Sequence, residues 1–314
     1  MNYLKDYREG EKFVGTYLCK QKQILKTKAG KTYYSLTLQD KTGTADGKIW
    51  ELNNGIANFE PMDYIHCEGM VTSFQGNLQM NISRVRISDE GEYDPADYVP
   101  CTNKDVGEMF SRILKYVASV QNKYLRKILE MYFVDNKEFV DAFKKHSAAK
   151  SVHHGFMGGL LEHTLSVTDM CQYFAEHYPM IHRDLLITAA LFHDMGKIQE
   201  ISDFPMNDYT DDGQLLGHIY IGARCMENAA AQIPNFPPKL KNELVHCILA
   251  HHGKMEFGSP KVPAIMEAMA LHMADNADAK LQTLTEVFTQ AGDNMGWLGF
   301  NRMFESNLRK TSEE

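Results

Sequence analysis

Histidine and aspartate residues in the second half of the chain are spaced as metal ligands often are. Residues 191–197 read Leu-Phe-His-Asp-Met-Gly-Lys, so that His193 and Asp194 adjoin at the end of an apolar stretch. An adjacent His-Asp pair is weak evidence alone, but the sequence holds further donors, namely His163, His218, His251, His252 and Asp275. Successive donors are separated by the length of one helix and its connection. A helical bundle can direct one ligand from each helix to a shared centre.

The donor set combines imidazole with carboxylate and contains no thiolate. This mixture suits Mn, Fe, Zn, Ni or a similar divalent ion rather than a structural thiolate zinc site. Asp194 is placed to bridge two ions, and a pair of ions about 3.5–4 Å apart can clamp the attacking and leaving oxygens of a phosphoryl displacement. Lys197 follows Asp194 by three residues, so on a continuous helix it would share the same face and neutralise a phosphate oxygen.

Other polar residues near the motif carry weaker signals. Asp278 lies one turn beyond Asp275, which fits a carboxylate behind the ligands or one in solvent. His153 and His154 precede a predicted helix, where contact with substrate and a capping or surface role fit equally well. Histidines outside the motif, such as His146, are expected to take no part in the site.

The elements that must position these donors are helices. From about residue 103 onward, apolar residues recur at helical spacing. The periodicity predicts helices over 103–120, 122–133, 136–146, 159–178, 184–197, 216–232, 238–252 and 262–290. Before this region, residues 89–102 are acidic and irregular, which indicates a linker.

The first part of the chain has the alternation of half-buried strands. Strands are predicted over 12–24, 33–39, 44–50, 64–74 and 78–87, with turn residues between them. The alternation slips near Ser83 and Arg84, which predicts a β-bulge. Five short strands, with a non-strand piece after the third, fit a small antiparallel barrel of the OB type.

The barrel segment has features of a single-stranded nucleic-acid platform. Residues 1–48 hold nine lysines and one arginine against five acidic residues. Tyr33, Lys48 and Trp50 are candidate contacts, because bases stack on exposed aromatic rings and phosphates pair with lysine. Phe74, in the turn before Gly76, is a further candidate, and so is His154 in the helical region. Burial of Trp50 in the barrel core is an equally good interpretation of its position.

The order of the donors resembles the HD superfamily of metal-dependent phosphohydrolases, over roughly residues 150–280. Together with the barrel, the chain resembles the YhaM family of 3'-5' exoribonucleases, a match supported by His153-His154-Gly155 and by the sequence Gly-Gly-Leu-Leu-Glu-His-Thr-Leu-Ser-Val around His163. The resemblance implies one ion on His163, His193, Asp194 and Asp275, and a second that Asp194 shares with His218 and with His251, His252 or both. It also implies activation by Mn and release of nucleoside 5'-monophosphates.

The sequence therefore predicts a multi-domain protein, a small all-β OB-like barrel followed by an all-α HD-type helical domain. We expect the barrel over 1–88, the linker over 89–102, connecting helices over 103–150, the HD phosphohydrolase domain over 151–290 and a C-terminal tail over 291–314. Apolar residues in the tail, including Trp297 and Phe300, favour packing on the bundle or on a second subunit of a homo-oligomer.

The expected function is a metal-dependent 3'-5' exoribonuclease that uses Asp194 and Lys197 in catalysis and acts on single-stranded RNA, with single-stranded DNA as a further substrate to test. One alternative is a hydrolase of free or cyclic nucleotides with an accessory barrel. Another is a non-catalytic adaptor that binds nucleic acid.

The amino-acid composition limits the kinds of partner and the cellular compartment that we expect for this protein. The net charge of −8 over 314 residues excludes a uniformly basic nucleic-acid-binding protein, so a polyanion must meet a local patch or metal ions. Six scattered cysteines without a CxxC pair indicate reduced thiols. With no apolar leader and no apolar run of spanning length, the sequence predicts a cytoplasmic protein that has no membrane partner.

Overall fold

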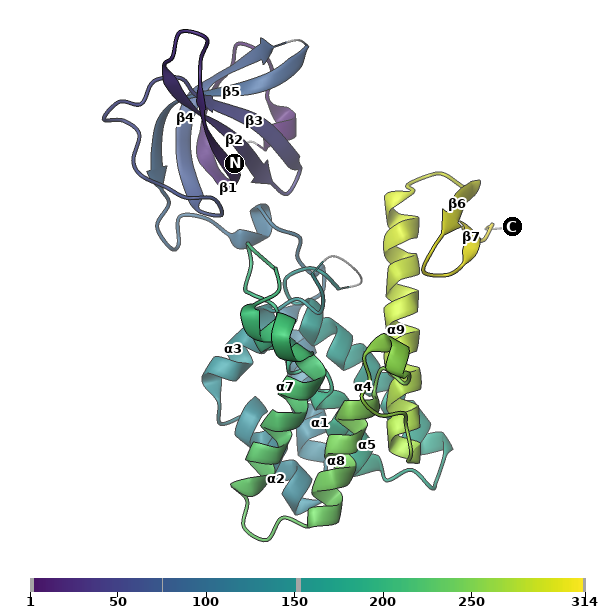
Figure 1. The fold of residues 1–314 in the computed structure, drawn as a ribbon. Helices are drawn as coiled ribbons and strands as arrows, with labels where there is room; N and C mark the ends of the chain where they lie inside the picture. Colours follow the sequence, from purple (N-terminus) through teal and green to yellow (C-terminus); the bar gives the residue numbers. More distant parts are fainter. Residues whose placement is uncertain (1–2, 75, 151–153, 313–314) are drawn as a thin grey trace. The chain divides into compact units, whose positions relative to one another are not determined.

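The computed structural model describes residues 3–74, 76–150 and 154–312 (Figure 1). His153, one of the residues that carried the family resemblance, lies outside the described residues. The chain forms two compact units. One consists of Met1–Cys101 with Phe204–Met206, and the other of Thr102–Asp203 with Asn207–Glu314.

The first unit is a closed five-stranded barrel with the strand order β1-β2-β3-β5-β4 (Figure 1). Its strands are β1 (Lys12–Lys26), β2 (Thr32–Asp40), β3 (Gly43–Ile49), β4 (Tyr64–Phe74) and β5 (Asn77–Ile87). The expected antiparallel pairing holds for every pair except β3 with β5, which are parallel. The non-strand stretch between β3 and β4 carries the chain across to β1, and β4 pairs antiparallel with that strand. The hairpin from β4 to β5 then places β5 beside β3, and the two strands run in the same direction.

The pattern of side chains in the barrel follows the alternation in the sequence. Leu36 and Leu38 of β2 are buried in the barrel core, while Ser35 and Thr37 face outward. The predicted bulge is present, since Glu68 pairs with Arg84 and Gly69 with Ile82, which leaves Ser83 without a partner in the ladder. Gly69 is required at this point, because a Cβ there would lie 2.0 Å from the carbonyl oxygen of Asn81.

The second unit is a helical bundle, which confirms the predicted fold class. Its helices are α1 (Val106–Ser119), α2 (Lys123–Phe133), α3 (Lys137–Lys145), α4 (Gly159–His177), α5 (Arg183–Phe192), α6 (Lys197–Glu200), α7 (Asp211–Ala231), α8 (Pro238–Ala250) and α9 (Met266–Gln290). Their apolar faces meet in one core, which includes Leu165 of α4, Ile187 of α5 and Ile248 of α8.

Two predicted helices differ from the structure at the metal motif. The helix predicted over 184–197 ends at Phe192, and α6 begins only at Lys197, with 193–196 forming a tight turn between them. The helix predicted from 216 begins at Asp211 and is interrupted at Gly217, which has φ 72° and ψ 152°. Backbone of this kind favours glycine, so the break is specified by that residue. Both irregularities lie beside a metal donor.

The C-terminal segment contains a small hairpin. After α9, strands β6 (Trp297–Asn301) and β7 (Ser306–Arg309) pair antiparallel. Trp297 and Phe300 are exposed rather than packed on the bundle of their own chain. Among the residues described, no helix is both long enough and apolar enough to span a bilayer.

Candidate metal centre

All seven side chains that the sequence marks as metal donors come together in the helical unit. His163 lies in α4, His193 and Asp194 lie in the turn after α5, and His218 lies in α7 directly after the break at Gly217. His251 and His252 lie in the turn directly after α8, and Asp275 lies in α9. Three helices and two turns therefore supply the donors, which the topology brings to a single point.

The first half of the cluster consists of His163, His193 and Asp275, whose donor atoms lie within 4.8 Å of one another. The Nε2 atoms of His163 and His193 are 3.1 Å apart. His163 Nε2 is also 3.3 Å from Asp194 Oδ2 and 3.3 Å from Asp275 Oδ1. Two imidazole nitrogens and two carboxylate oxygens thus surround one small volume.

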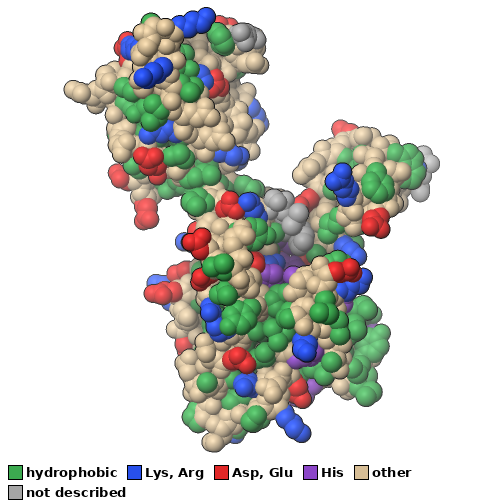
Figure 2. Space-filling model, in the orientation of Figure 1, with side chains coloured by type: hydrophobic (Ala, Val, Ile, Leu, Met, Phe, Trp, Pro, Cys, Tyr) green, Lys and Arg blue, Asp and Glu red, His purple; other side chains and the backbone are tan. Residues whose placement is uncertain are grey.

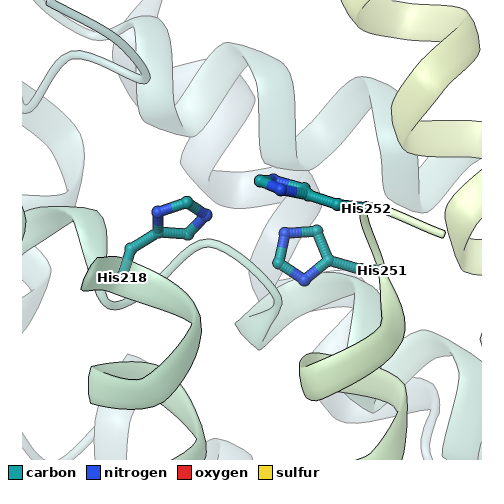
Figure 3. Close-up of side chains that lie close together, drawn as sticks. All are labelled: His218, His251 and His252. Atoms are coloured by element: carbon teal, nitrogen blue, oxygen red, sulfur yellow. The ribbon is translucent and has the colours of Figure 1, made fainter. Parts of the chain in front are cut away.

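The second half consists of His218, His251 and His252, which point toward one another from α7 and from the end of α8 (Figure 3). Asp194 lies between the two halves. Its Oδ1 is 3.5 Å from His218 Nε2 and 3.6 Å from His251 Nε2, while its Oδ2 faces His163 and His193. Each oxygen of this carboxylate therefore faces a different half of the cluster, which is the arrangement of a carboxylate that bridges two ions.

The tautomers of the histidines favour metal binding. The Nδ1–H groups of His193, His251 and His252 donate to the backbone carbonyl oxygens of Ala190, Ile248 and Phe257, at 2.7, 2.7 and 2.8 Å. A carbonyl oxygen can only accept, so the proton of each neutral ring is on Nδ1 and the Nε2 lone pair is available. A fixed Nδ1 hydrogen bond is the usual arrangement for a metal-binding imidazole.

Buried polar atoms in the cluster lack any hydrogen-bond partner among the residues that the structure describes. Three of these atoms lie around the second half of the cluster, namely Asp194 Oδ1, His218 Nε2 and His251 Nε2. Unpaired buried acceptors are costly, and a cation held between them would satisfy all three at once. The residues present therefore fit a divalent metal.

The electrostatics of the cluster match this interpretation. Burial lowers the pKa of His251 and, together with the adjacent His251 ring, lowers the pKa of His252 to about 4, so both rings are neutral at pH 7. Burial alone would lower the pKa of His163, but hydrogen bonds with Asp194, Asp275 and Asp278 outweigh it and raise that pKa. A bound cation would displace the proton of His163, so metal binding should release protons.

Asp194 and Asp275 are held in their ionised form. Burial would raise the pKa of Asp194, but Lys197 and His193 lower it well below the usual range. Burial would likewise raise the pKa of Asp275. The hydrogen bond with His163 and the charge of the neighbouring histidines outweigh burial and lower that pKa. Ionised carboxylates beside neutral imidazoles are the protonation states that a divalent metal needs.

Lys197 takes a different position from the one predicted. It is the first residue of α6 rather than the last turn of α5, and its Nζ lies 2.6 Å from Asp194 Oδ2. Burial would lower the pKa of Lys197, but Asp194 outweighs it and raises that pKa, so the amine stays charged. The helix expected to continue from Asp194 through Lys197 is therefore interrupted, and the two side chains meet across the turn instead.

Asp278 and His154 lie behind His163. Asp278 Oδ2 accepts from His163 Nδ1 at 2.7 Å and from His154 Nε2 at 2.9 Å, and its Oδ1 accepts from Ser166 Oγ. His154 is only 2% exposed. Its predicted contact with nucleic acid is therefore corrected: the ring supports the carboxylate that orients His163. Asp278 was a candidate for this place from its spacing along the chain, but no signal in the sequence indicated Ser166.

Glu200 is a second carboxylate behind the cluster, and sequence reasoning missed it. Its Oε1 lies 2.9 Å from His218 Nδ1. Burial would raise the pKa of Glu200, but the hydrogen bond with His218 prevails and lowers it. The one feature of the sequence that could have indicated Glu200 was its place three residues after Lys197, on the short helix α6.

The glycine of the His-Asp motif allows the turn to approach α7. A Cβ on Gly196 would lie 2.1 Å from the carbonyl oxygen of His218 and 2.9 Å from the amide nitrogen of Gly222. We expect Gly196→Ala to destabilise the protein by about 1–3 kcal/mol, because a buried backbone contact must open, and to weaken metal binding by displacing His218. Thermal unfolding and metal titration measure the two effects.

Gly222→Ala is the matched control for this prediction. Gly222 lies on α7, the helix that Gly196 approaches, and its Cβ would meet nothing closer than Ile248 Cγ2 at 3.6 Å. Equal stability of the two variants would contradict the steric role of Gly196.

The cluster reaches the surface on one side. His193 and His251 are fully buried, whereas His218, His252 and Asp275 are partly exposed. Figure 2 shows histidine side chains in a hollow on one face of the helical unit. The cluster is therefore open to solvent on the side of His218, His252 and Asp275.

The candidate nucleic-acid contacts of the barrel lie outside its core. Trp50 is 40% exposed, its ring stacks on Tyr33 with centroids 4.6 Å apart, and its Nε1 donates to Asn81 Oδ1 at 3.0 Å. Burial of Trp50 in the core is thus wrong. Lys48 is held by Asp46 Oδ1 at 2.5 Å and by Ser35 Oγ at 2.7 Å. Phe74, at the end of β4, is 61% exposed.

Comparison with known proteins agrees with this geometry. The HD domain family matches residues 160–280, the region that holds every donor. The 3'-5' exoribonuclease YhaM of Bacillus subtilis (strain 168) is 32% identical over 262 residues, covering 81% of this chain and 81% of that protein. The same enzyme of Geobacillus sp. (strain WCH70) is 32% identical over 257 residues, 81% of this chain and 78% of that protein. The enzyme of Listeria innocua serovar 6a is 32% identical over 293 residues, 90% of each chain. Because this similarity runs through both the barrel and the helical unit, the chain belongs to the YhaM family of 3'-5' exoribonucleases.

Proposed function

We propose that the protein is a metal-dependent exoribonuclease that removes nucleotides from the 3' end of single-stranded RNA and releases nucleoside 5'-monophosphates. The observation that carries the proposal is the position of Asp194, whose two carboxylate oxygens face two separate groups of histidines. The family relatives are named for the same activity. Mn is the ion to test first.

Two divalent ions in the cluster would supply a water of lowered pKa and would neutralise charge on the phosphodiester. The protein residues provide the rest. Asp194 fixes the spacing of the two halves, and Lys197 holds Asp194 Oδ2 in place through a 2.6 Å contact. Asp275 balances the positive charge on the first half. Partly exposed His252 and Asp275 border the opening through which the terminal phosphate enters.

The activity assay uses an oligoribonucleotide labelled at its 5' end, incubated with the protein and Mn²⁺. We expect a ladder that shortens from the 3' end, with mononucleotides as products. A parallel reaction with oligodeoxyribonucleotide measures whether DNA is also cut, and one with free and cyclic nucleotides tests the alternative substrates. Absence of shortening with Mn²⁺, Co²⁺, Zn²⁺ and Mg²⁺ would reject the proposal.

The barrel is proposed to hold the single strand by stacking. Tyr33 and Trp50 present neighbouring aromatic surface, and Lys48 lies on the same face, because it pairs in the ladder with Ser35, two residues after Tyr33. Lys48 contributes little free charge, because Asp46 already pairs with it. Stacked aromatic rings with nearby lysines are suited to sequence-tolerant binding of single strands.

Replacement of both rings, Tyr33→Ala with Trp50→Ala, tests the platform. Each base that loses a stacking partner should cost about 1–3 kcal/mol, so we expect KM for a long oligonucleotide to rise roughly 5- to 150-fold. Turnover of a dinucleotide should stay unchanged, because it does not need the barrel. Phe300→Ala, which removes an exposed ring from the β6–β7 hairpin, is the control. An unchanged KM for the long substrate would contradict the platform.

A further inference from the structure

Glu200 is a buried carboxylate committed to one histidine of the metal centre. It ends the short helix α6 and is 8% exposed. A single oxygen, Oε1, accepts both the Nδ1–H and the backbone N–H of His218, each at 2.9 Å. Both hydrogen bonds hold one residue of the second half of the cluster, so His218 is fixed in position and in orientation.

The break in α7 is what makes the second of these hydrogen bonds available. Within a regular helix the N–H of His218 would donate to a carbonyl four residues earlier. Gly217, at φ 72° and ψ 152°, interrupts that pattern immediately before His218 and leaves its N–H directed at Glu200. Gly217 and Glu200 therefore act together, the first by freeing a donor and the second by accepting from it.

The two halves of the cluster are built in the same way. In the first half, Asp278 holds Nδ1 of His163; in the second, Glu200 holds Nδ1 of His218. His193, His251 and His252 use backbone carbonyls instead. A carboxylate behind an imidazole strengthens its donation to a metal more than a carbonyl does, and loss of such a partner typically costs 10- to 100-fold in metal affinity.

We propose that Glu200 is the positioning residue of the second half-site: by holding both His218 Nδ1 and His218 N, it orients that ring as a ligand and sets the affinity for the second ion. The inference rests on the proposed metal centre. Glu200 does not touch substrate, so its effect passes entirely through the ion held by His218, His251, His252 and Asp194.

The experiment titrates metal-free protein with Mn²⁺ and measures free Mn²⁺ by electron paramagnetic resonance. The unaltered protein should bind two ions. In Glu200→Ala, we expect one ion to bind as before and the other about 10- to 100-fold more weakly. Exonuclease activity should then need a correspondingly higher Mn²⁺ concentration, with kcat recovering as the ion saturates. A role in folding alone would not produce this split between the two ions.

Two further variants make the result decisive. Glu200→Gln keeps the shape and an accepting oxygen, so it should fold and lose less affinity than Glu200→Ala. Glu267→Ala removes a glutamate that is equally buried, at 7% exposure, but accepts from the backbone N of His182, and it should bind both ions normally. Normal binding of both ions by both Glu200 variants would overturn the role of Glu200 but leave the proposed metal centre in place. Failure of the unaltered protein to bind any ion would reject the metal centre itself.

Discussion

Replacement of Asp194 with alanine should cause the largest loss of exonuclease activity and should weaken metal binding in both halves of the cluster. The carboxylate lies within 3.6 Å of four imidazole nitrogens and is fully buried. No other described carboxylate faces both groups of histidines. We expect kcat to fall by about 10³-fold or more, or about 4 kcal/mol of transition-state stabilisation.

Metal content separates loss of the site from loss of the fold. Asp194→Ala should retain its helical circular dichroism while its Mn²⁺ stoichiometry falls below that of the unaltered protein. Asp169→Ala serves as the control, because Asp169 lies on the same helix as His163 but pairs with Arg112 and Tyr116 on the surface. Undiminished activity in Asp194→Ala would show that the reaction occurs elsewhere.

Replacement of Lys197 with methionine should have the second largest effect. The amine contacts Asp194 Oδ2 at 2.6 Å, and methionine fills a similar volume without the charge. Without this partner the bridging carboxylate loses its fixed orientation and the site loses a positive charge near the phosphate. We expect kcat to fall about 10²-fold, with a smaller change in KM.

The control for Lys197 is a lysine paired with a carboxylate away from the cluster. Lys104 Nζ lies 2.9 Å from Oε1 of the buried Glu162, so Lys104→Met also removes a cation from a buried acid. It should leave kcat within about twofold of normal. Equal losses in the two variants would indicate a general effect of unpaired acids rather than a role of Lys197 in the site.

The donors of the metal centre could be predicted because each is a chemically distinctive residue within or directly after an apolar helical run. The prediction of His163, His218 and Asp275 as donors needed only one assumption, which is that each helix packs with one polar position facing the interior. The barrel was predictable for a similar reason: the alternation around Leu36 and Leu38, and its slip at Ser83, record which face of each strand is buried.

The parts that the sequence did not predict depend on local breaks in regular structure. Lys197 was placed on the wrong helix because α5 ends at Phe192, where the ring of His193 bonds the carbonyl of Ala190. Glu200 acquires its role only because Gly217 turns the backbone of His218 toward it. His154 was assigned to nucleic acid because burial behind another histidine leaves no trace in spacing along the chain.

We propose that these donors hold two divalent ions with Asp194 between them. Anomalous diffraction from crystals grown with Mn²⁺ tests it most directly. The expected result is a pair of peaks, one among His163, His193 and Asp275 and one among His218, His251 and His252, each next to a different oxygen of Asp194. A map without manganese among these side chains, collected from crystals of protein that degrades RNA, would contradict the claim.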